Sequence, residues 1–172
     1  DVTDLVRADG TIRPPQPSFE FMKPRLSRWI AFGLGSGLSR TAPGTVGTLF
    51  AWASFVPLYQ LLGTAGMGVL WVLSLALGVW AVERVGRDLG EHDHSAVVWD
   101  EVVAFWGVLL LVPATFATQL VSFLLFRFFD IVKPPPIRRI DREWQGPVGA
   151  MADDLLAAGF TVLVVAFWVR FG

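Results

Sequence analysis

Three long stretches of the sequence lack charged residues, and they constrain the fold more than any other feature. No Asp, Glu, Lys or Arg occurs in residues 41–82, 102–126 or 155–169. About a quarter of the residues in a soluble domain are charged, whereas here 17% are charged and 53% are hydrophobic. Apolar stretches of this length are typical of membrane spans. The sequence therefore predicts an all-α integral membrane protein.

The lengths of these stretches indicate how many helices they form. A span needs about 20 residues, so 41–82 is too long for one helix, and Gly63 and Gly66 interrupt it. We predict helices at 47–62 and 65–82, joined as a hairpin. Residues 102–126 form either one span or two short helices at 102–112 and 116–129, and we prefer two. With a last span at 155–169, we expect a bundle of about four to five short transmembrane or partly spanning helices.

Positive charges predict which side of the membrane the polar segments face. They flank both hairpins on the same side: Lys23, Arg25, Arg28, Arg40, Arg84 and Arg87 for the first, and Arg127, Lys133, Arg138, Arg139 and Arg142 for the second. Positive residues are enriched in cytoplasmic loops, so we predict cytoplasmic polar loops. Residues 1–27 are expected to be a polar, flexible extension, and residues 28–172 the membrane domain.

Composition excludes several functions. The formal net charge of −1 argues against nucleic-acid binding, which needs a strongly basic surface. The sequence has no Cys, which excludes disulfides, thiolate nucleophiles and Cys-ligated metals. It leaves the oligomeric state open.

Two acidic pairs each stand directly before an apolar stretch. Asp100 and Glu101 precede residue 102, and Asp153 and Asp154 precede residue 155. Acids at a helix start also complement the helix dipole, but adjacent carboxylates at a bilayer border are costly unless paired or metal-bound. Their oxygens suit Mg²⁺. Two nearby histidines, His92 and His94, bind metal, relay protons or lie in a solvated loop.

Two further segments carry basic residues. Arg127 and Asp130 are three residues apart on a predicted helix and can pair, and Lys133 stands before three prolines, which force an extended path. The glycine- and hydroxyl-rich segment 33–47 contains Arg40 and suits a phosphate. The alternatives are a basic patch for lipid headgroups and close helix packing through small residues.

The sequence resembles the phosphatidylglycerophosphatase A family over about residues 28–159. The motifs that carry the resemblance are Gly35-Ser-Gly-Leu-Ser-Arg-Thr-Ala-Pro-Gly-Thr, Val98-Trp-Asp-Glu-Val-Val, Phe126-Arg-Phe-Phe-Asp-Ile-Val-Lys-Pro-Pro-Pro-Ile-Arg and Gly149-Ala-Met-Ala-Asp-Asp. The family often has Gly in place of Ala104 and a bulkier residue in place of Ala152. Neither difference removes a ligand.

The resemblance implies a Mg²⁺-dependent phosphatase of the bacterial cytoplasmic (inner) membrane, multi-pass, with its active site facing the cytoplasm. Its substrate would be phosphatidylglycerophosphate, converted to phosphatidylglycerol in phospholipid biosynthesis. The implied catalytic residues are Asp100, Glu101 and Asp130, and we add His94 as a candidate proton acceptor. The implied metal ligands are Asp100, Asp130, Asp153 and Asp154. The implied phosphate-binding residues are Ser39, Arg40, Thr41, Lys133 and Arg138. The nucleophile is either water or an aspartate.

Two other functions are compatible with intramembrane acids and basic partners: a small cation carrier and a non-enzymatic lipid-binding subunit. A carrier would place its acids along a path through the membrane, whereas these acids cluster at one edge. A lipid-binding subunit would use the basic patch and leave the acidic pairs without a role.

Overall fold

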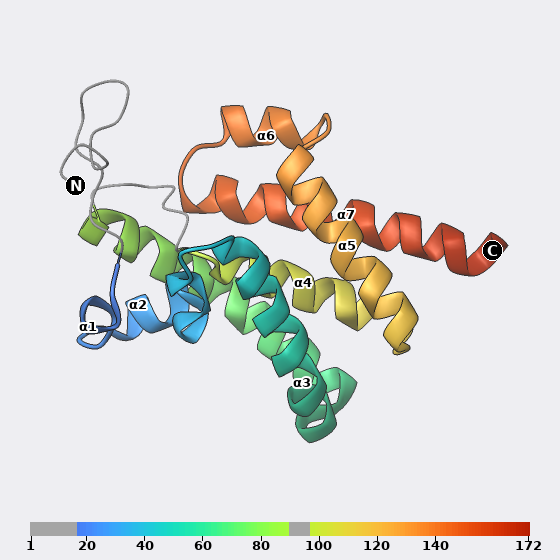
Figure 1. Ribbon diagram of the computed structural model, residues 1–172, viewed down its shortest axis with the longest axis horizontal. Coiled ribbons are helices and arrows are strands. Elements are labelled where there is room, and N and C mark those ends of the chain that lie inside the picture. Colours follow the sequence, from blue (N-terminus) through green and yellow to red (C-terminus); the bar gives the residue numbers. More distant parts are fainter. Residues whose placement is uncertain (1–16, 90–96) are drawn as a thin grey trace.

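The computed structural model describes residues 17–89 and 97–172, and Figure 1 shows them as helices joined by short turns. The elements are α1 (Phe19–Met22), α2 (Leu26–Ala31), the 3₁₀ segment η2 (Gly33–Leu38), α3 (Pro43–Leu89), α4 (Trp99–Leu111), α5 (Phe116–Val132), α6 (Ile137–Glu143) and α7 (Pro147–Phe171). The described residues contain helices and no strand, which confirms the predicted fold class. His92 and His94 lie outside the described residues.

α3 is the predicted hairpin. Gly63 has φ 67° and ψ −177°, so the helical path breaks there. This left-handed φ is open to glycine and strained for other residues. Figure 1 shows the chain descending in the first half of α3 and returning in the second. Both ends of α3 therefore lie away from the hairpin tip.

The stretch 102–126 forms two helices, as preferred from the sequence. α4 ends at Leu111, and α5 begins at Phe116 after the N-cap Thr115, whose side chain accepts a hydrogen bond from the Thr118 amide. This cap satisfies one of the amides that a helix start leaves unpaired. A single continuous helix across this stretch is not present. Which side of a membrane the turn faces stays a prediction.

α4 is the central helix of the fold and is buried by α3, α5 and α7. Its buried residues are Trp99, Val102, Val103, Ala104, Phe105, Trp106, Val108 and Leu109. Three indole N–H groups tie it to the α3 hairpin: Trp71 donates to the Val103 carbonyl (2.9 Å), Trp99 to the Ser74 carbonyl (3.1 Å) and Trp106 to the Ala51 carbonyl (3.0 Å). These bonds hold α4, from its first turn onward, against the α3 hairpin.

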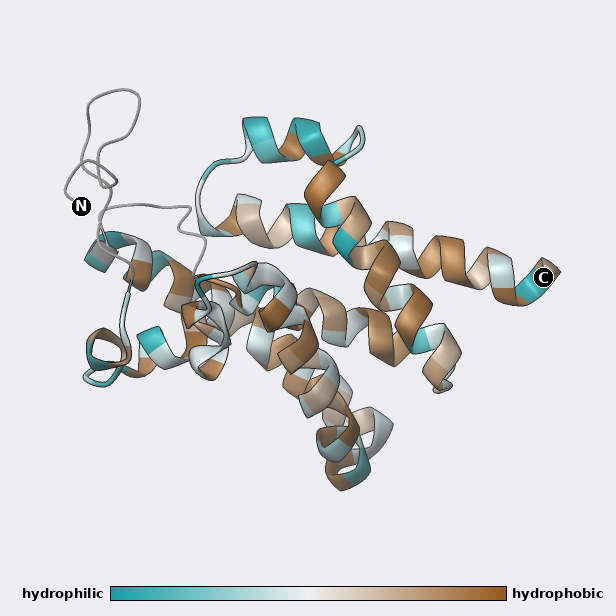
Figure 2. Ribbon diagram, viewed as in Figure 1, coloured by the Kyte–Doolittle hydropathy of each residue, from teal (hydrophilic) through white to brown (hydrophobic). Residues whose placement is uncertain are grey.

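The outer faces of the long helices are apolar. α3 and α7 are long and apolar enough to cross a membrane, and only 28% and 39% of their most apolar windows are buried. A buried core helix of a soluble protein would hide most of that surface. Figure 2 shows apolar residues along α3, α5 and α7, with hydrophilic residues on α6, on the adjoining parts of α5 and α7, and near α2 and the end of α3. The fold thus has an apolar body and one polar end.

A second, smaller core joins the N-terminal helices to the end of α3. Met22 and Phe32 are buried there against Val85. Asp88 accepts hydrogen bonds from Arg25 (3.0 Å) and Arg28 (3.1 Å). These contacts hold α2 against the last turns of α3.

Candidate active site

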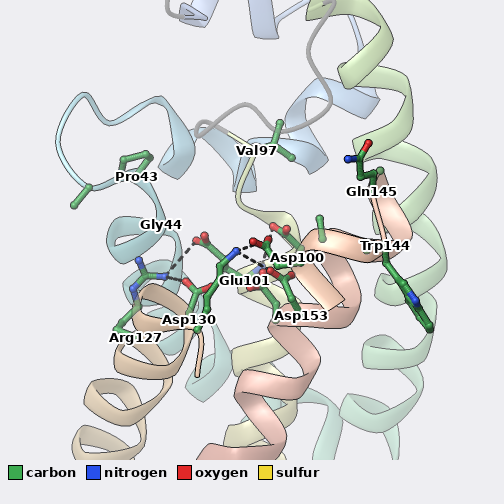
Figure 3. A pocket seen from close by; sticks show the side chains of 17 residues that line it. Pro43, Gly44, Val97, Asp100, Glu101, Arg127, Asp130, Trp144, Gln145 and Asp153 are labelled. Carbon is green, nitrogen blue, oxygen red and sulfur yellow. Dashed lines mark hydrogen bonds and ion pairs between the residues drawn. The ribbon is translucent and has the colours of Figure 1, made fainter. Parts of the chain in front are cut away.

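A cavity of about 560 Å³ opens at the polar end of the fold (Figure 3). It is enclosed by the first turns of α3 and α4, the end of α5, and the segment from α6 into α7. Eight charged residues line it: Asp100, Glu101, Asp130, Asp141, Asp153, Asp154, Arg127 and Lys133. Six acids therefore face two cations in one cavity.

The local structure of each helix places these acids. Asp100 and Glu101 lie in the first turn of α4, and Asp130 lies near the end of α5. α7 begins with Pro147 after Gly146, which has φ 90°. A Cβ on Gly149 would lie 1.6 Å from the Trp144 carbonyl oxygen, so only glycine permits this approach. That contact packs the first turn of α7, about one turn before Asp153 and Asp154, against Trp144.

Three carboxylates form the tightest group of acids among the described residues. One oxygen from each of Glu101, Asp130 and Asp154 lies within 4.8 Å of the others. Asp154 is buried, and Glu101 Oε2 is a buried atom without a hydrogen-bond partner in the described structure. Carboxylates this close repel one another unless a proton or cation lies between them. The oxygen-only donor set and the unpartnered oxygen fit a hard divalent cation.

The two acids in the first turn of α4 have raised pKa values. Burial raises the pKa of Asp100 to about 7; a hydrogen bond from the Glu101 backbone amide opposes this effect, and repulsion from Asp130 adds to it. Burial also raises the pKa of Glu101, with repulsion from Asp100 adding to the effect and Arg127 opposing it. Both carboxylates therefore need a counter-charge to stay ionised at neutral pH.

Arg127 supplies part of that counter-charge. Its Nη1 pairs with Asp130, as the spacing of three residues predicted, and lies 3.8 Å from Glu101 Oε2. Its Nε is buried and has no hydrogen-bond partner among the described residues. Figure 3 shows the guanidinium beside both acids. Arg127 thus adjoins two of the three clustered carboxylates.

Lys133 is the second cation that lines the cavity. Its Nζ donates to Asp141 Oδ1 (2.6 Å) and to Asp153 Oδ2 (2.9 Å). Burial alone would lower the pKa of Lys133, but the hydrogen bonds to Asp141 and Asp153 outweigh it and raise the pKa above the ordinary value. The ammonium therefore stays charged at physiological pH.

Comparison with known proteins identifies the family to which this chain belongs. The family model described as phosphatidylglycerophosphatase A matches residues 29–169. The chain belongs to the phosphatidylglycerophosphatase A family. The predicted resemblance is confirmed, and with it the enzyme class, a phosphatase. Membership of a lipid-phosphatase family and the two apolar helices together indicate a membrane protein.

Three curated relatives cover most of the chain. A phosphatidylglycerophosphatase A from Haemophilus influenzae is 42% identical over 79% of this chain and 84% of its own. One from Escherichia coli is 36% identical over 80% of each chain. A putative phosphatidylinositol-3-phosphatase from Bacteroides thetaiotaomicron is 41% identical over 81% of this chain and 92% of its own. No solved structure matches.

The structure brings all five acids predicted for this phosphatase into one cavity. Asp130 and Asp154 belong to the clustered carboxylates, Asp100 lies beside them, and Asp153 is engaged by Lys133. Glu101, expected to be catalytic, is the third member of the cluster and so also a candidate ligand. The role of each residue stays a prediction.

The predicted phosphate-binding residues divide into two groups. Lys133 lines the cavity, whereas Ser39, Arg40, Thr41 and Arg138 are not among its lining residues. The Ser39 hydroxyl donates to the Thr41 carbonyl (2.9 Å) within its own turn. Arg138 is exposed and donates to the Val132 carbonyl (3.4 Å).

Two of the charged residues that line the cavity were not among the predicted site residues. Arg127 was expected only to pair with Asp130, and its i, i+3 spacing was the available signal. Asp141 reaches the cavity because α6 begins at Ile137, directly after the three prolines. The sequence predicted an extended path at the prolines but not the helix that follows them. No local pattern indicates the direction in which α6 runs.

Proposed function

We propose that this protein hydrolyses phosphatidylglycerophosphate to phosphatidylglycerol and inorganic phosphate. The observation that carries the proposal is the combination of clustered carboxylates and two cations in one cavity at the polar end of apolar helices. Phosphoryl transfer needs charge neutralised on the phosphate oxygens and a positioned nucleophile. The names of two relatives support this substrate.

Mg²⁺ is the proposed cofactor, held by Glu101, Asp130 and Asp154 with Asp100 beside them. The fit rests on the three convergent oxygens and on the unpartnered Glu101 Oε2. When bound, Mg²⁺ supplies positive charge at the phosphoryl oxygens, where negative charge develops in phosphoryl transfer.

The chain's own residues perform the remaining steps. Lys133 and Arg127 bind the oxygens of the terminal phosphate, a role that suits a fixed ammonium and a planar guanidinium. Asp100, which lines the cavity beside the clustered carboxylates, accepts the proton of the attacking water, and that proton passes to the glycerol oxygen as the P–O bond breaks. His94 is the alternative proton acceptor. A competing route forms an aspartyl phosphate, and phosphate covalently trapped on acid-quenched protein would identify it.

The substrate carries a second phosphate, the diester that joins glycerol to the lipid. The exposed Arg138 and the turn Ser39–Thr41 with Arg40 lie outside the cavity, and we assign them to this diester. The turn directly precedes Ala42 and Pro43, which line the cavity. One substrate molecule would therefore contact Lys133 inside the cavity and the Ser39–Thr41 turn at its border.

The proposed location is the bacterial inner membrane, with several spans and the cavity facing the cytoplasm. The exposed apolar faces of α3 and α7 support the membrane contact. The positive residues around the cavity support the cytoplasmic side. The lipid tails would stay in the bilayer while the headgroup enters the cavity.

Phosphate release from defined lipids tests this proposal. Purified protein in detergent micelles would be given phosphatidylglycerophosphate or phosphatidylinositol 3-phosphate, each with Mg²⁺ and with excess EDTA. We expect faster release from phosphatidylglycerophosphate, and none with EDTA. Faster release from phosphatidylinositol 3-phosphate would move the substrate toward that named for the Bacteroides relative. No release from folded protein would favour the carrier or the lipid-binding subunit.

A further inference from the structure

Lys133 is held by acids from two different helices, and the two acids differ in depth. Asp153 of α7 has a side chain that is 6% exposed, whereas Asp141 of α6 is 38% exposed. The ammonium contacts both, at 2.9 Å and 2.6 Å. The ammonium therefore bridges a buried acid on α7 and a partly exposed acid on α6.

The backbone of Lys133 gives an independent sign that its position is imposed. It is the C-cap of α5 and has φ 48° and ψ 64°, a left-handed conformation that is strained for a residue other than glycine. Such strain persists where the surrounding contacts over-determine the conformation, and it concentrates at functional sites. The ion pairs to Asp141 and Asp153 are such contacts.

We infer that Asp141 is a positioning residue that keeps the Lys133 ammonium directed at the substrate phosphate. The inference rests on the proposed function of the cavity. An ammonium has three N–H donors, and the two acids use two of them, which leaves one for a phosphate oxygen. Without Asp141, the ammonium would be drawn toward the buried Asp153, away from the entering phosphate. Asp141 therefore acts on substrate binding through Lys133 and not through the metal.

Kinetics of Asp141→Asn separate this role from a structural one. We expect KM for phosphatidylglycerophosphate to rise about tenfold, the size of one lost charge-assisted contact. kcat should stay within about twofold, and the Mg²⁺ concentration for half-maximal rate should not change. Asp141→Glu, which keeps the charge, should raise KM less. The matched control is Glu143→Gln on the same helix, which removes a surface pair with Arg139 and should leave KM unchanged.

A double-mutant cycle tests whether Asp141 acts through Lys133. In a Lys133→Met background, adding Asp141→Asn should raise KM no further, because the positioned group is already gone. Additive effects would overturn the inference. A fall in KM for Asp141→Asn would overturn it too, because it would mean that the carboxylate only repels the substrate.

A second readout does not depend on the lipid substrate. The unfolding temperature of the full chain in detergent with Mg²⁺ would be measured with and without inorganic phosphate. Phosphate should raise it for the wild type and Glu143→Gln, and less for Asp141→Asn. Equal increases for Asp141→Asn and the wild type, or no increase for the wild type, would overturn the inference. If the wild type hydrolyses no lipid, the proposed function fails and this arm still decides the role of Asp141.

Discussion

Gly44 lies directly against the carboxylate of Glu101. A Cβ at position 44 would come within 2.8 Å of both Glu101 Oε1 and Oε2, and within 3.0 Å of Arg127 Nη2. The first turn of α3 thus approaches the clustered acids as closely as a glycine allows. Because the contacts are with the charged side chains of the site, we expect a side chain at this position to displace those groups more than it destabilises the fold.

Gly44→Ala should therefore impair activity by displacing Glu101 and Arg127. We expect kcat/KM to fall about 10-fold to 100-fold, as for a displacement of about 1 Å at a reacting centre. Gly68→Ala in the same helix is the control, because a Cβ there meets nothing within 4 Å. Equal activities for both variants would show that the close approach has no catalytic consequence.

Arg127→Met should separate phosphate binding from metal binding. Removing the guanidinium takes away a phosphate contact, so kcat/KM should fall about 10-fold to 100-fold. The same change leaves Glu101 and Asp130 more negative, so the Mg²⁺ concentration for half-maximal rate should not rise. Both quantities come from titrations of substrate and of Mg²⁺. Arg139→Met removes an exposed charge on α6 and serves as the control; an increased Mg²⁺ requirement for Arg127→Met would contradict this account.

Trp106→Phe should destabilise the protein without changing its chemistry. The indole N–H donates to the Ala51 carbonyl (3.0 Å) and the Ser54 hydroxyl (3.2 Å), and its loss should cost about 1–3 kcal/mol. Thermal unfolding in detergent measures the loss, with Trp168→Phe on the exposed part of α7 as control. An unchanged unfolding temperature for Trp106→Phe would mean that these bonds do not hold α3 to α4.

Single cysteines can test the proposed sidedness, because the chain has none of its own. Ala114→Cys lies in the exposed turn between α4 and α5, and Arg142→Cys lies on α6. In intact cells, a membrane-impermeant thiol reagent should label position 114 from outside. Position 142 should react only after the membrane is permeabilised, so that the reagent reaches the cytoplasmic side. Labelling of both positions from the same side would contradict the hairpin topology.

The helices could be predicted from sequence because their signals are local. Charge-free length indicated the spans, and Gly63 marked the reversal inside α3. The acidic pairs could be identified as site residues, because adjacent carboxylates before apolar stretches are energetically costly without a partner. Each of these inferences used residues within one turn or one span of each other.

The rest depended on contacts between distant segments. Asp141 and Lys133 are eight residues apart with three prolines between them, and only the direction of α6 brings them together. The approach of Gly44 to Glu101 joins the starts of two helices. Ser39 and Arg40 suited a phosphate by composition, yet composition does not tell whether a turn lines a cavity or borders it.

The most direct test of the central claim is a Mg²⁺ titration of phosphate release from phosphatidylglycerophosphate, run in parallel for the wild type and Asp154→Asn. Asn keeps the shape of this buried side chain and removes its charge from the carboxylate cluster. The account predicts that wild-type release requires Mg²⁺. It also predicts that the rate of Asp154→Asn is at least about 100-fold lower at every Mg²⁺ concentration. The unfolding temperature of each protein, measured in EDTA, shows that the variant is folded. Wild-type rates and Mg²⁺ dependence in Asp154→Asn would contradict it.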